Sequence, residues 1–245
     1  MTIRYEANPP KILPGINTNE SITKFIEKIK IISKKCDAIH ITENVLGHQR
    51  VSPIKVGEII RKEIPNIPIT VSLRVRDKSE NEILEFVENC ISIGFSGILV
   101  LMGDPSQTKK PDLGQIPSAV VKKLRENGVD SKIDLYLSIS NDPNFSKIRK
   151  KIEANPKGYM TQVVQSVEQV QNLSDNLKEF SIIPIILFPS EKNEKSAKFL
   201  GLELEAYSKE FEEFVKKVYA ITNDVLITSP NDFNGLNEFL EKRIS

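Results

Sequence analysis

Two acidic residues and one glutamine are the side chains best placed to do chemistry in this sequence. Glu6 lies at the end of a short apolar run, Asp104 follows another, and Gln162 lies inside a third. A carboxyl group that is partly removed from water has a raised pKa and can act as a general acid. A glutamine in an apolar run must find hydrogen-bonding partners. A helix cap or an ion pair is an equally good explanation for each carboxylate, and a neighbouring strand could equally satisfy Gln162.

Other kinds of site have weaker support. His40 and His48 form no HxH or HExxH pattern, which argues against a metal site. Cys36 and Cys90 are far apart and lack CxxC spacing, so we expect packing residues rather than a disulfide framework or a zinc site. No GxGxxG or GxxxxGK[ST] motif occurs. The basic cluster at residues 147–151 is expected to be a solvated helix face, although beside a binding site it could hold a pyrophosphate.

Composition narrows the class of protein. The chain has 245 residues, with 34 Lys and Arg against 33 Asp and Glu, and a net charge of +1. This balance argues against nucleic acid as the main partner. No apolar run reaches the roughly 18 residues of a membrane span, and the first six residues contain no apolar stretch of a secretory signal. We therefore expect a cytoplasmic protein with no membrane segment, and the sequence leaves room for a homo-oligomer.

Short β-branched runs alternate with segments of helical period along the whole chain. Strands are predicted at residues 3–7, 38–42, 67–75, 97–102, 133–139, 159–164, 182–188 and 224–228. Helices are predicted at residues 19–34, 52–63, 79–92, 117–126, 144–154, 166–180, 194–222 (interrupted at Gly201) and 233–244. Near-continuous apolar runs are typical of parallel strands that are buried on both faces. Eight βα units in about 250 residues predict an α/β fold, a single-domain (β/α)8 TIM barrel over residues 1–245, in preference to a doubly wound open sheet.

In such a barrel the active site lies at the carboxyl ends of the strands. The polar or turn-forming residues predicted there are Glu6, Thr42, Glu43, Asn44, Arg74, Arg76, Gly103, Asp104, Ser138, Ser140, Asn141, Thr161, Gln162, Pro189, Ser190, Thr228, Ser229 and Asn231. Because Thr161 and Gln162 are adjacent, only one of their side chains can line the barrel.

Five segments, taken in order, resemble the methylenetetrahydrofolate reductase family. Residues 5–11 (YEANPPK) are similar to its opening F-E-x-x-P-P-[KR], and residues 37–42 are similar to its second strand. Residues 101–105 (LMGDP) resemble L-R-G-D. Residues 150–162 resemble K-x-[DE]-A-G-A followed by T-Q, and residues 183–190 resemble I-x-P-G-I-x-P. The resemblance implies a (β/α)8 barrel that carries FAD, in a divergent member of the family for which an archaeal origin is open.

The resemblance also implies roles for the chemically suited residues. Glu6 takes the position of the family's general acid, and Asp104 that of an aspartate near the flavin and the pterin. Gln162 matches a glutamine that contacts folate and nicotinamide. The implied enzyme is an oxidoreductase of one-carbon metabolism and methionine biosynthesis, which reduces 5,10-methylene-tetrahydropterin to the 5-methyl form. Its substrate would be a folate or a related pterin.

The cofactor residues that the resemblance implies are Thr42, Gly103, Asp104 and Lys151, with FAD and with NAD(P)H or another hydride donor as cofactors. Met102 replaces the arginine of L-R-G-D, and residues 154–156 read ANP where the family has A-G-A. The family's FAD-binding positions are thus less well matched in this sequence than its pterin-binding positions. Two alternatives remain open at this stage: a pterin-binding methyltransferase-type barrel, or a non-catalytic subunit of the family that has lost FAD.

Overall fold

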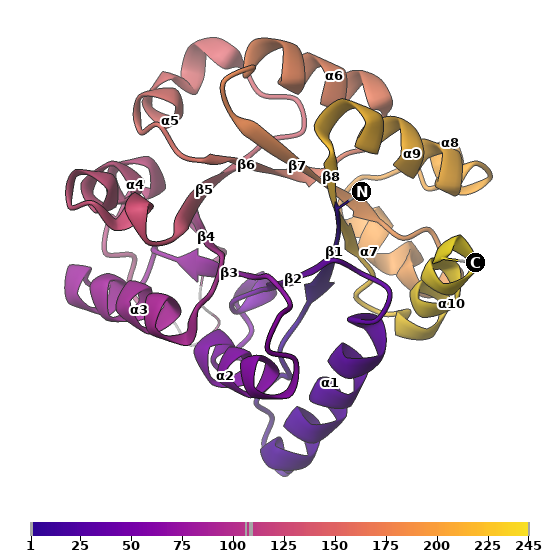
Figure 1. Cartoon of the computed structure of the whole chain (residues 1–245), viewed down its shortest axis with the longest axis horizontal. Coiled ribbons are helices and arrows are strands. Elements are labelled where there is room, and N and C mark those ends of the chain that lie inside the picture. The colour runs from indigo at the N-terminus through magenta and orange to yellow at the C-terminus, as the bar shows by residue number, and fades with distance from the viewer. Residues whose placement is uncertain (1, 106, 108–109, 245) are drawn as a thin grey trace.

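The eight strands form a closed barrel in which every neighbouring pair is parallel. The computed structural model describes residues 2–105, 107 and 110–244. The strands follow one another in chain order and the barrel closes where β1 pairs with β8 (Figure 1). They are β1 (Thr2–Ala7), β2 (Ala38–Ile41), β3 (Ile69–Arg74), β4 (Gly97–Leu101), β5 (Asp134–Ile139), β6 (Gly158–Val163), β7 (Ser181–Leu187) and β8 (Asp224–Thr228). The predicted (β/α)8 barrel is confirmed.

Helices surround the barrel as an outer ring (Figure 1). They are α1 (Thr18–Ile32), α2 (Pro53–Glu63), α3 (Glu80–Ile93), α4 (Pro117–Glu126), α5 (Arg149–Glu153), α6 (Val167–Asn176), α7 (Glu194–Phe199), α8 (Glu205–Ser208), α9 (Phe211–Thr222) and α10 (Phe233–Ile244). No helix within the described residues is long and apolar enough to cross a membrane.

Two of the predicted helices are more broken than expected. The segment at residues 144–154 begins with a 3-10 turn at Phe145–Lys147 and is α-helical only over Arg149–Glu153. The long segment at residues 194–222 consists of α7, α8 and α9, and Gly201 lies in the first break, where the interruption was predicted. Helical period alone does not reveal these breaks, because apolar spacing continues across them.

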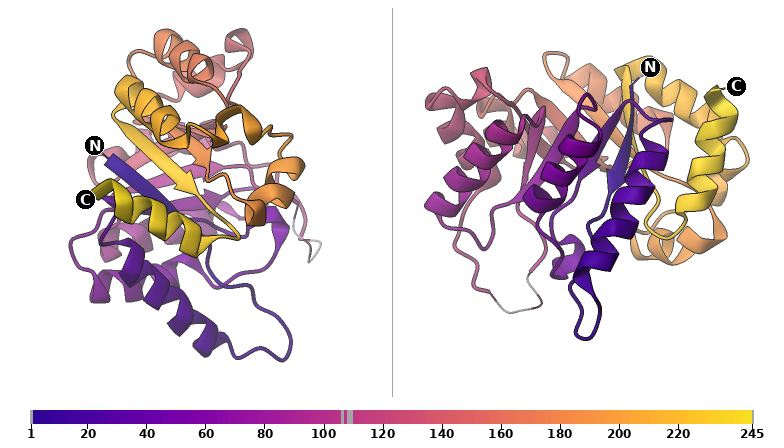
Figure 2. Two further views of the ribbon diagram at one scale, coloured as in Figure 1. Left: turned by 90° about the vertical axis from the view of Figure 1, so that its right-hand side faces the viewer. Right: turned by 60° about the horizontal axis from the view of Figure 1, so that its bottom comes forward.

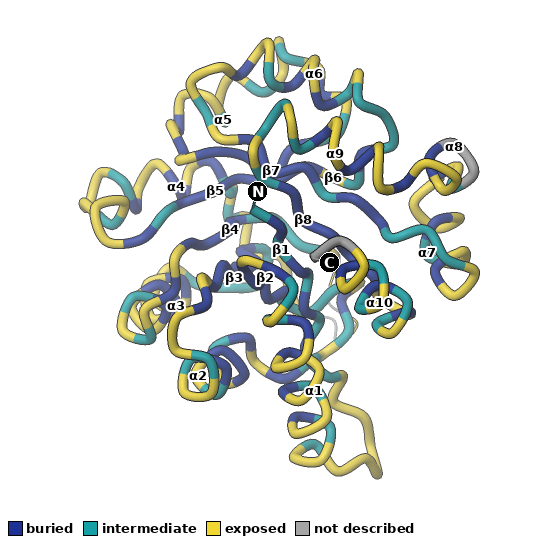
Figure 3. The backbone as a smooth tube through the Cα atoms, turned by 45° about the vertical axis from the view of Figure 1, so that its right-hand side comes forward, coloured by how far each residue is buried: buried dark blue, intermediate teal, exposed yellow. Residues whose placement is uncertain are grey.

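The main core lies between the strands and the helices. In α1 the buried residues Ile22, Ile26, Ile29 and Ile32 recur every three or four positions and face the barrel. Burying a side chain of this size is worth roughly 1.5–3 kcal/mol. The helices keep exposed residues on their outer faces while the strands are buried (Figure 3). The helix ring is therefore held mainly by apolar contact with the sheet.

The interior of the barrel divides into an apolar and a polar part. The apolar part is a separate small cluster made by residues of β4 to β8: Leu99, Tyr136, Met160, Ile183 and Leu226. The polar part belongs to β1 to β3. There His40 bonds Thr70 through Nδ1 (2.9 Å) and Ser72 through Nε2 (3.0 Å). Burial lowers the pKa of His40 to about 3, so the imidazole is neutral.

The βα loops all leave the barrel at the carboxyl ends of the strands. In the right-hand view of Figure 2 the loop between β1 and α1 projects from the end of the barrel opposite to the N-terminus. This arrangement brings the ends of β1, β2 and β8 together, because β1 pairs with both of the others. The mouth of the barrel is thus built from segments far apart in the sequence.

Candidate active site

Glu6 lies on the inner face of β1 at the mouth of the barrel. Along β1 the buried residues alternate with partly exposed ones, and Tyr5 and Ala7 pack into the core outside the barrel. Glu6 therefore points inward. On the adjacent strand β8 its neighbour is Thr228, whose hydroxyl donates to Oε1 of Glu6 at 2.6 Å. The carboxyl group is surrounded by protein on the side of the strands and remains partly exposed toward the mouth.

Burial is the main influence on the charge state of Glu6. Loss of solvent raises the pKa of its carboxyl group above 4.5, while hydrogen bonds from Thr228 and Asn8 and the positive charge of Arg50 partly offset that rise. A carboxyl group with a raised pKa holds its proton at a pH where an ordinary carboxylate has lost it. The direction of this pKa shift is the one that favours a general acid.

Asn8 contacts Glu6 and is itself held by the hydroxyl of Thr42. The amide nitrogen of Asn8 lies 3.5 Å from Oε1 of Glu6, and the amide oxygen of Asn8 accepts a hydrogen bond from the buried Thr42 hydroxyl (2.8 Å). Arg50 donates to the carbonyl of Pro9 at 2.6 Å. The structure thus connects Glu6 with Thr42, two of the residues predicted for the site, through Asn8.

Asp104 occupies a different setting, in the loop after β4. It is exposed, so the predicted partial removal from water applies to Glu6 and not to Asp104. Its Oδ2 accepts the backbone N–H of Leu46 at 3.1 Å, which ties the loop after β4 to the loop after β2. Leu46 has φ +57°, a left-handed conformation that is costly for a residue with a side chain. Such strain is frequent at functional sites.

Arg74, at the end of β3, fixes the backbone that carries Asp104. Its side chain is 2% exposed, and its Nη2 donates to the carbonyl oxygen of Asp104 at 2.8 Å. Gly103 lies directly over this side chain: a Cβ at position 103 would lie 2.3 Å from Nε of Arg74. Gly103 also has φ +80°, which favours glycine. Close packing against Arg74 therefore gives Gly103 a structural role.

Carboxylates surround the same arginine. Asp77 lies 3.5 Å from its guanidinium group, and Glu43 accepts the backbone N–H of Arg74 at 2.7 Å. Glu43 also pairs with Lys78 at 2.6 Å. This cluster makes the β3–β4 side of the mouth rich in charge and densely hydrogen-bonded.

Gln162 lies at an irregularity in β6. The pairing of β6 with β7 shifts register between Met160 and Val163. Thr161 is buried, and its hydroxyl accepts the backbone N–H of Ile185 at 3.0 Å, whereas Gln162 is exposed. Of the two explanations for Gln162, a hydrogen bond to a neighbouring strand inside the barrel is therefore not the one that the structure shows. Its amide is available to a ligand at the carboxyl end of β6.

Lys151 meets a chemical requirement for a phosphate-bearing cofactor. Its Nζ donates to the carbonyl of Ser138, near the end of β5, at 2.6 Å, and burial lowers the pKa of its ammonium group. Within the described residues no carboxylate forms an ion pair with it. A phosphate would supply the missing opposite charge. Of the residues proposed for FAD, Lys151 fits the group through this uncompensated charge, while the Thr42 hydroxyl already has Asn8 as its acceptor.

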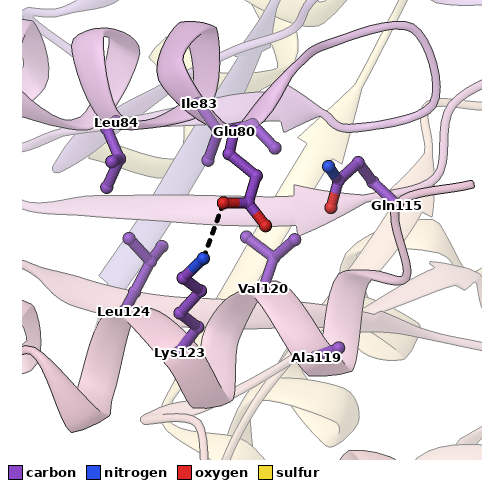
Figure 4. Close-up of a pocket in the computed structure, with 8 residues that line it drawn as sticks. All are labelled: Glu80, Ile83, Leu84, Gln115, Ala119, Val120, Lys123 and Leu124. Carbon is purple, nitrogen blue, oxygen red and sulfur yellow. Dashed lines mark hydrogen bonds and ion pairs between the residues drawn. The ribbon is translucent and has the colours of Figure 1, made fainter. Parts of the chain in front are cut away.

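A hollow in the surface lies away from the mouth. It lies on the outside between α3 and α4, where Glu80 and Lys123 form an ion pair of 2.7 Å across it (Figure 4). Both side chains are more than half exposed. Its polar lining is Glu80, Gln115 and Lys123, and two of these are already paired with each other. We therefore assign the site to the mouth of the barrel, where the buried carboxyl group of Glu6 lies. Within the described residues, no group of three or more His, Cys, Asp or Glu could hold a metal ion.

The fold and the mouth together define a (β/α)8 barrel with a desolvated acid at the end of β1. The family model of methylenetetrahydrofolate reductase matches residues 1–203, so the chain belongs to that family. The match covers all the residues singled out above from Glu6 to Gln162. A search of curated proteins finds no match.

Solved structures share the fold at low sequence identity. A chain of tryptophan synthase from Pyrococcus furiosus has a TM-score of 0.58 at 11% identity, covering 99% of this chain and 95% of its own. 2,3-Dimethylmalate lyase, a member of the PEP mutase/isocitrate lyase superfamily, has a TM-score of 0.56 at 10% identity, with 99% and 79% covered. A protein from Aquifex aeolicus VF5 also has a TM-score of 0.56, at 12% identity, with 99% and 86% covered. These similarities show the fold alone.

The contacts of several residues at the mouth could not be predicted from the sequence pattern. Thr228 and Arg74 are visible in the sequence as polar residues at strand ends, but nothing there connects Thr228 with Glu6 or Arg74 with Asp104. In the sequence, Arg50 is only a residue of a loop and Asn8 is only a position in the first motif, so neither is indicated as a neighbour of Glu6. The strand order of a closed barrel could have found Thr228, since β1 and β8 must be neighbours.

Proposed function

We propose that this protein binds a folate or a related pterin at the mouth of the barrel and reduces its 5,10-methylene bridge to a 5-methyl group. The observation that supports this most strongly is Glu6, a carboxyl group with a raised pKa at the end of β1, in a chain of the methylenetetrahydrofolate reductase family. Asp104 and Gln162 are the exposed polar groups at the ends of β4 and β6 that we assign to the substrate.

The chemistry assigned to Glu6 is a proton transfer. The carboxyl group donates its proton to the second nitrogen of the methylene bridge, the one outside the pterin ring, and the bond between that nitrogen and the methylene carbon breaks. The five-membered ring opens and the positive charge remains on an iminium carbon. Addition of a hydride to that carbon yields the methyl group. Glu6 becomes a carboxylate, which hydrogen bonds from Thr228 and Asn8 stabilise.

Asp104 and Gln162 orient the reactants. The Asp104 carboxylate is suited to accept hydrogen bonds from the amino edge of a pterin, and the Gln162 amide can donate and accept. Transfer of a hydride requires the two carbon centres to be in contact, so holding the pterin in one orientation contributes much of the rate.

FAD is the cofactor that we propose, with NAD(P)H or another donor to reduce it. When bound, it supplies the hydride. Lys151 would hold a phosphate of the cofactor, and Thr42, Gly103 and Asp104 are the other residues that we assign to the cofactor. The uncompensated charge of Lys151 supports this assignment.

The test combines uptake of cofactor with product formation. We expect the purified protein, after incubation with FAD and gel filtration, to retain the visible absorbance of an oxidised flavin. With a reductant it should convert 5,10-methylenetetrahydrofolate to the 5-methyl form. Protein that takes up no flavin but binds the pterin would favour the methyltransferase alternative. Protein that binds neither would favour the non-catalytic subunit.

A matched pair of variants tests the cofactor residue. Lys151→Met should weaken retention of FAD, because it removes the half-buried charge, whereas Lys157→Met removes an exposed lysine near the opposite end of the barrel and should not. Equal retention in both variants would contradict the assignment of Lys151.

A further inference from the structure

The two oxygens of the Glu6 carboxyl group have different surroundings. Oε1 receives the hydroxyl of Thr228 at 2.6 Å and the amide nitrogen of Asn8 at 3.5 Å. No hydrogen bond to Oε2 is found within the described residues. Glu6 is partly exposed, and Oε2 has no protein partner, so Oε2 is the oxygen free to bond a ligand.

The direction of the hydrogen bonds at Oε1 is fixed by a chain of donors. The hydroxyl of Thr42 donates to Oδ1 of Asn8 at 2.8 Å, which turns the amide nitrogen of Asn8 toward Glu6. An amide nitrogen can only donate, so Oε1 must accept from it. In a protonated carboxyl group the accepting oxygen is the carbonyl oxygen, and the proton resides on the other.

We propose that Thr228 is a positioning residue for Glu6: together with Asn8 it makes Oε1 the accepting oxygen, so that Oε2 carries the proton and faces the substrate. This inference rests on the proposed function, in which Glu6 is the general acid. It adds the atom that donates the proton and the strand, β8, that selects it. Thr228 is 6% exposed and holds the side chain of Glu6 without being needed to touch the substrate.

Few charged groups lie close to Glu6, so the loss of one neutral donor, the hydroxyl of Thr228, should change the pKa of Glu6 measurably. Arg50 is the charged group that acts on the carboxyl, and it belongs to the loop after β2. On β1, the phenol of Tyr5 is affected by Glu6 but points into the outer core. On β2, His40 is paired in register with Glu6 and is neutral, with its nitrogens engaged by Thr70 and Ser72. Arg4, further down the inner face of β1, is paired with Asp224.

The test replaces the hydroxyl with a methyl group of similar size. Thr228→Val should lower kcat about ten-fold with little change in KM, because Glu6 loses its fixed orientation while the binding groups remain. It should also move the high-pH limb of the kcat profile upward by about one to two pH units, since a hydrogen bond to a charged group is worth about 1.5–3 kcal/mol and stabilises the carboxylate. Thr228→Ser retains the donor and should restore both values.

The control is a second threonine at the opposite end of the barrel. The hydroxyl of Thr222 donates to the carbonyl of Asp224 at 2.7 Å, at the start of β8. Thr222→Val makes the same substitution at a less buried threonine and should leave the pH profile unchanged. A hydroxyl at position 228 that served only to stabilise the fold would behave in the same way as the control.

Two results would overturn the inference. One is a Thr228→Val enzyme whose kcat and pH profile equal those of the wild type, and the other is an effect confined to KM. If Thr228→Val does not fold, Thr228→Ala removes the same donor with a smaller side chain and carries the same expectations. If the wild type reduces no methylene-tetrahydropterin, the proposed function fails. Infrared titration of the Glu6 carboxyl in the ligand-free protein then still decides whether removing the Thr228 hydroxyl raises its pKa.

Discussion

The two sides of the barrel mouth treat their carboxylates in opposite ways. On the β1–β8 side, Glu6 is held by neutral donors and burial raises its pKa. On the β3–β4 side, Asp104 is exposed and its backbone is fixed by the buried guanidinium group of Arg74. The first side therefore favours a carboxyl group that keeps a proton. The second favours a carboxylate that is rigidly placed and open to solvent and ligand.

This difference indicates how one side of the mouth can donate a proton while the other side orients the ligand. A proton donor needs removal from water, and at Glu6 burial outweighs the hydrogen bonds from Thr228 and Asn8 and the charge of Arg50. A group that orients a polar ligand needs a fixed backbone and an exposed side chain, which the contacts of Arg74, Gly103 and Leu46 provide. Exchanging or removing the groups on either side should therefore have consequences of different kinds.

The largest effect is expected from Glu6→Gln. The amide keeps the size of the side chain but has no proton to give, so turnover should fall about 10²–10⁴-fold. Glu80→Gln is the matched control, because Glu80 lies in the exposed ion pair on the outside of α3 (Figure 4). Steady-state reduction of 5,10-methylenetetrahydrofolate by the three proteins measures this. Equal turnover by Glu6→Gln and the wild type would exclude Glu6 as the acid.

The second effect should appear in stability. Arg74→Met leaves the carboxylate of Asp77 and the carbonyl of Asp104 without their buried partner, so the free energy of unfolding should fall by about 3–5 kcal/mol. Arg125→Met breaks a more exposed pair with Asp130 and should cost about 0–1 kcal/mol. Urea unfolding compares the two variants. Similar losses in both would show that Arg74 does not brace the β3–β4 side.

Asp104→Asn should have a smaller effect on activity and almost none on stability. The amide oxygen of asparagine can still accept the N–H of Leu46, and the side chain is exposed. Loss of one charge-assisted hydrogen bond to the pterin predicts a fall of about 10–100-fold in kcat/KM. The free energy of unfolding should stay within about 0.5 kcal/mol of the wild type. A large loss of stability would contradict the description of Asp104 as an exposed ligand-facing group.

The effect that is smallest at neutral pH, and develops only in acid, is the pH dependence contributed by His40. Its pKa is about 3 in the folded protein and 6.5 in the unfolded chain, so the unfolded state binds the proton more readily. The contribution of His40 to stability is therefore fully present above pH 6.5 and is lost as pH falls from 6.5 to about 3, by about 1.4 kcal/mol per pH unit. His40→Gln should flatten this part of the curve measured by urea unfolding. An unchanged slope would mean that His40 does not titrate as its burial predicts.

Much of the fold follows from the sequence because each strand is a short β-branched run. Such runs predict β4 at residues 97–102 and β8 at residues 224–228, and the structure has Gly97–Leu101 and Asp224–Thr228. Local chemistry also predicts the start of α3, where Ser79 and Glu82 form a capping box. These features depend on neighbours in the chain, and so a single sequence contains them.

The site was only partly predictable for the opposite reason. Glu6 is identified by its place at a strand end and by the family resemblance. Its partner Thr228 lies 222 residues away, and the contact exists only because the barrel closes. Gln162 is exposed where the pairing of β6 with β7 shifts register, and the sequence of β6 alone does not encode that shift. Long-range pairing, rather than local preference, determines these details.

The most direct test of Glu6 as a proton-holding acid is a titration of its own carboxyl group. Infrared difference spectra of the wild type, with Glu6→Gln as the reference, follow the absorbance of the protonated carboxyl group as pH is raised. We expect the midpoint to lie above 4.5, the ordinary value for glutamate, because burial outweighs the hydrogen bonds and the charge of Arg50. A midpoint at or below 4.5 would contradict the account.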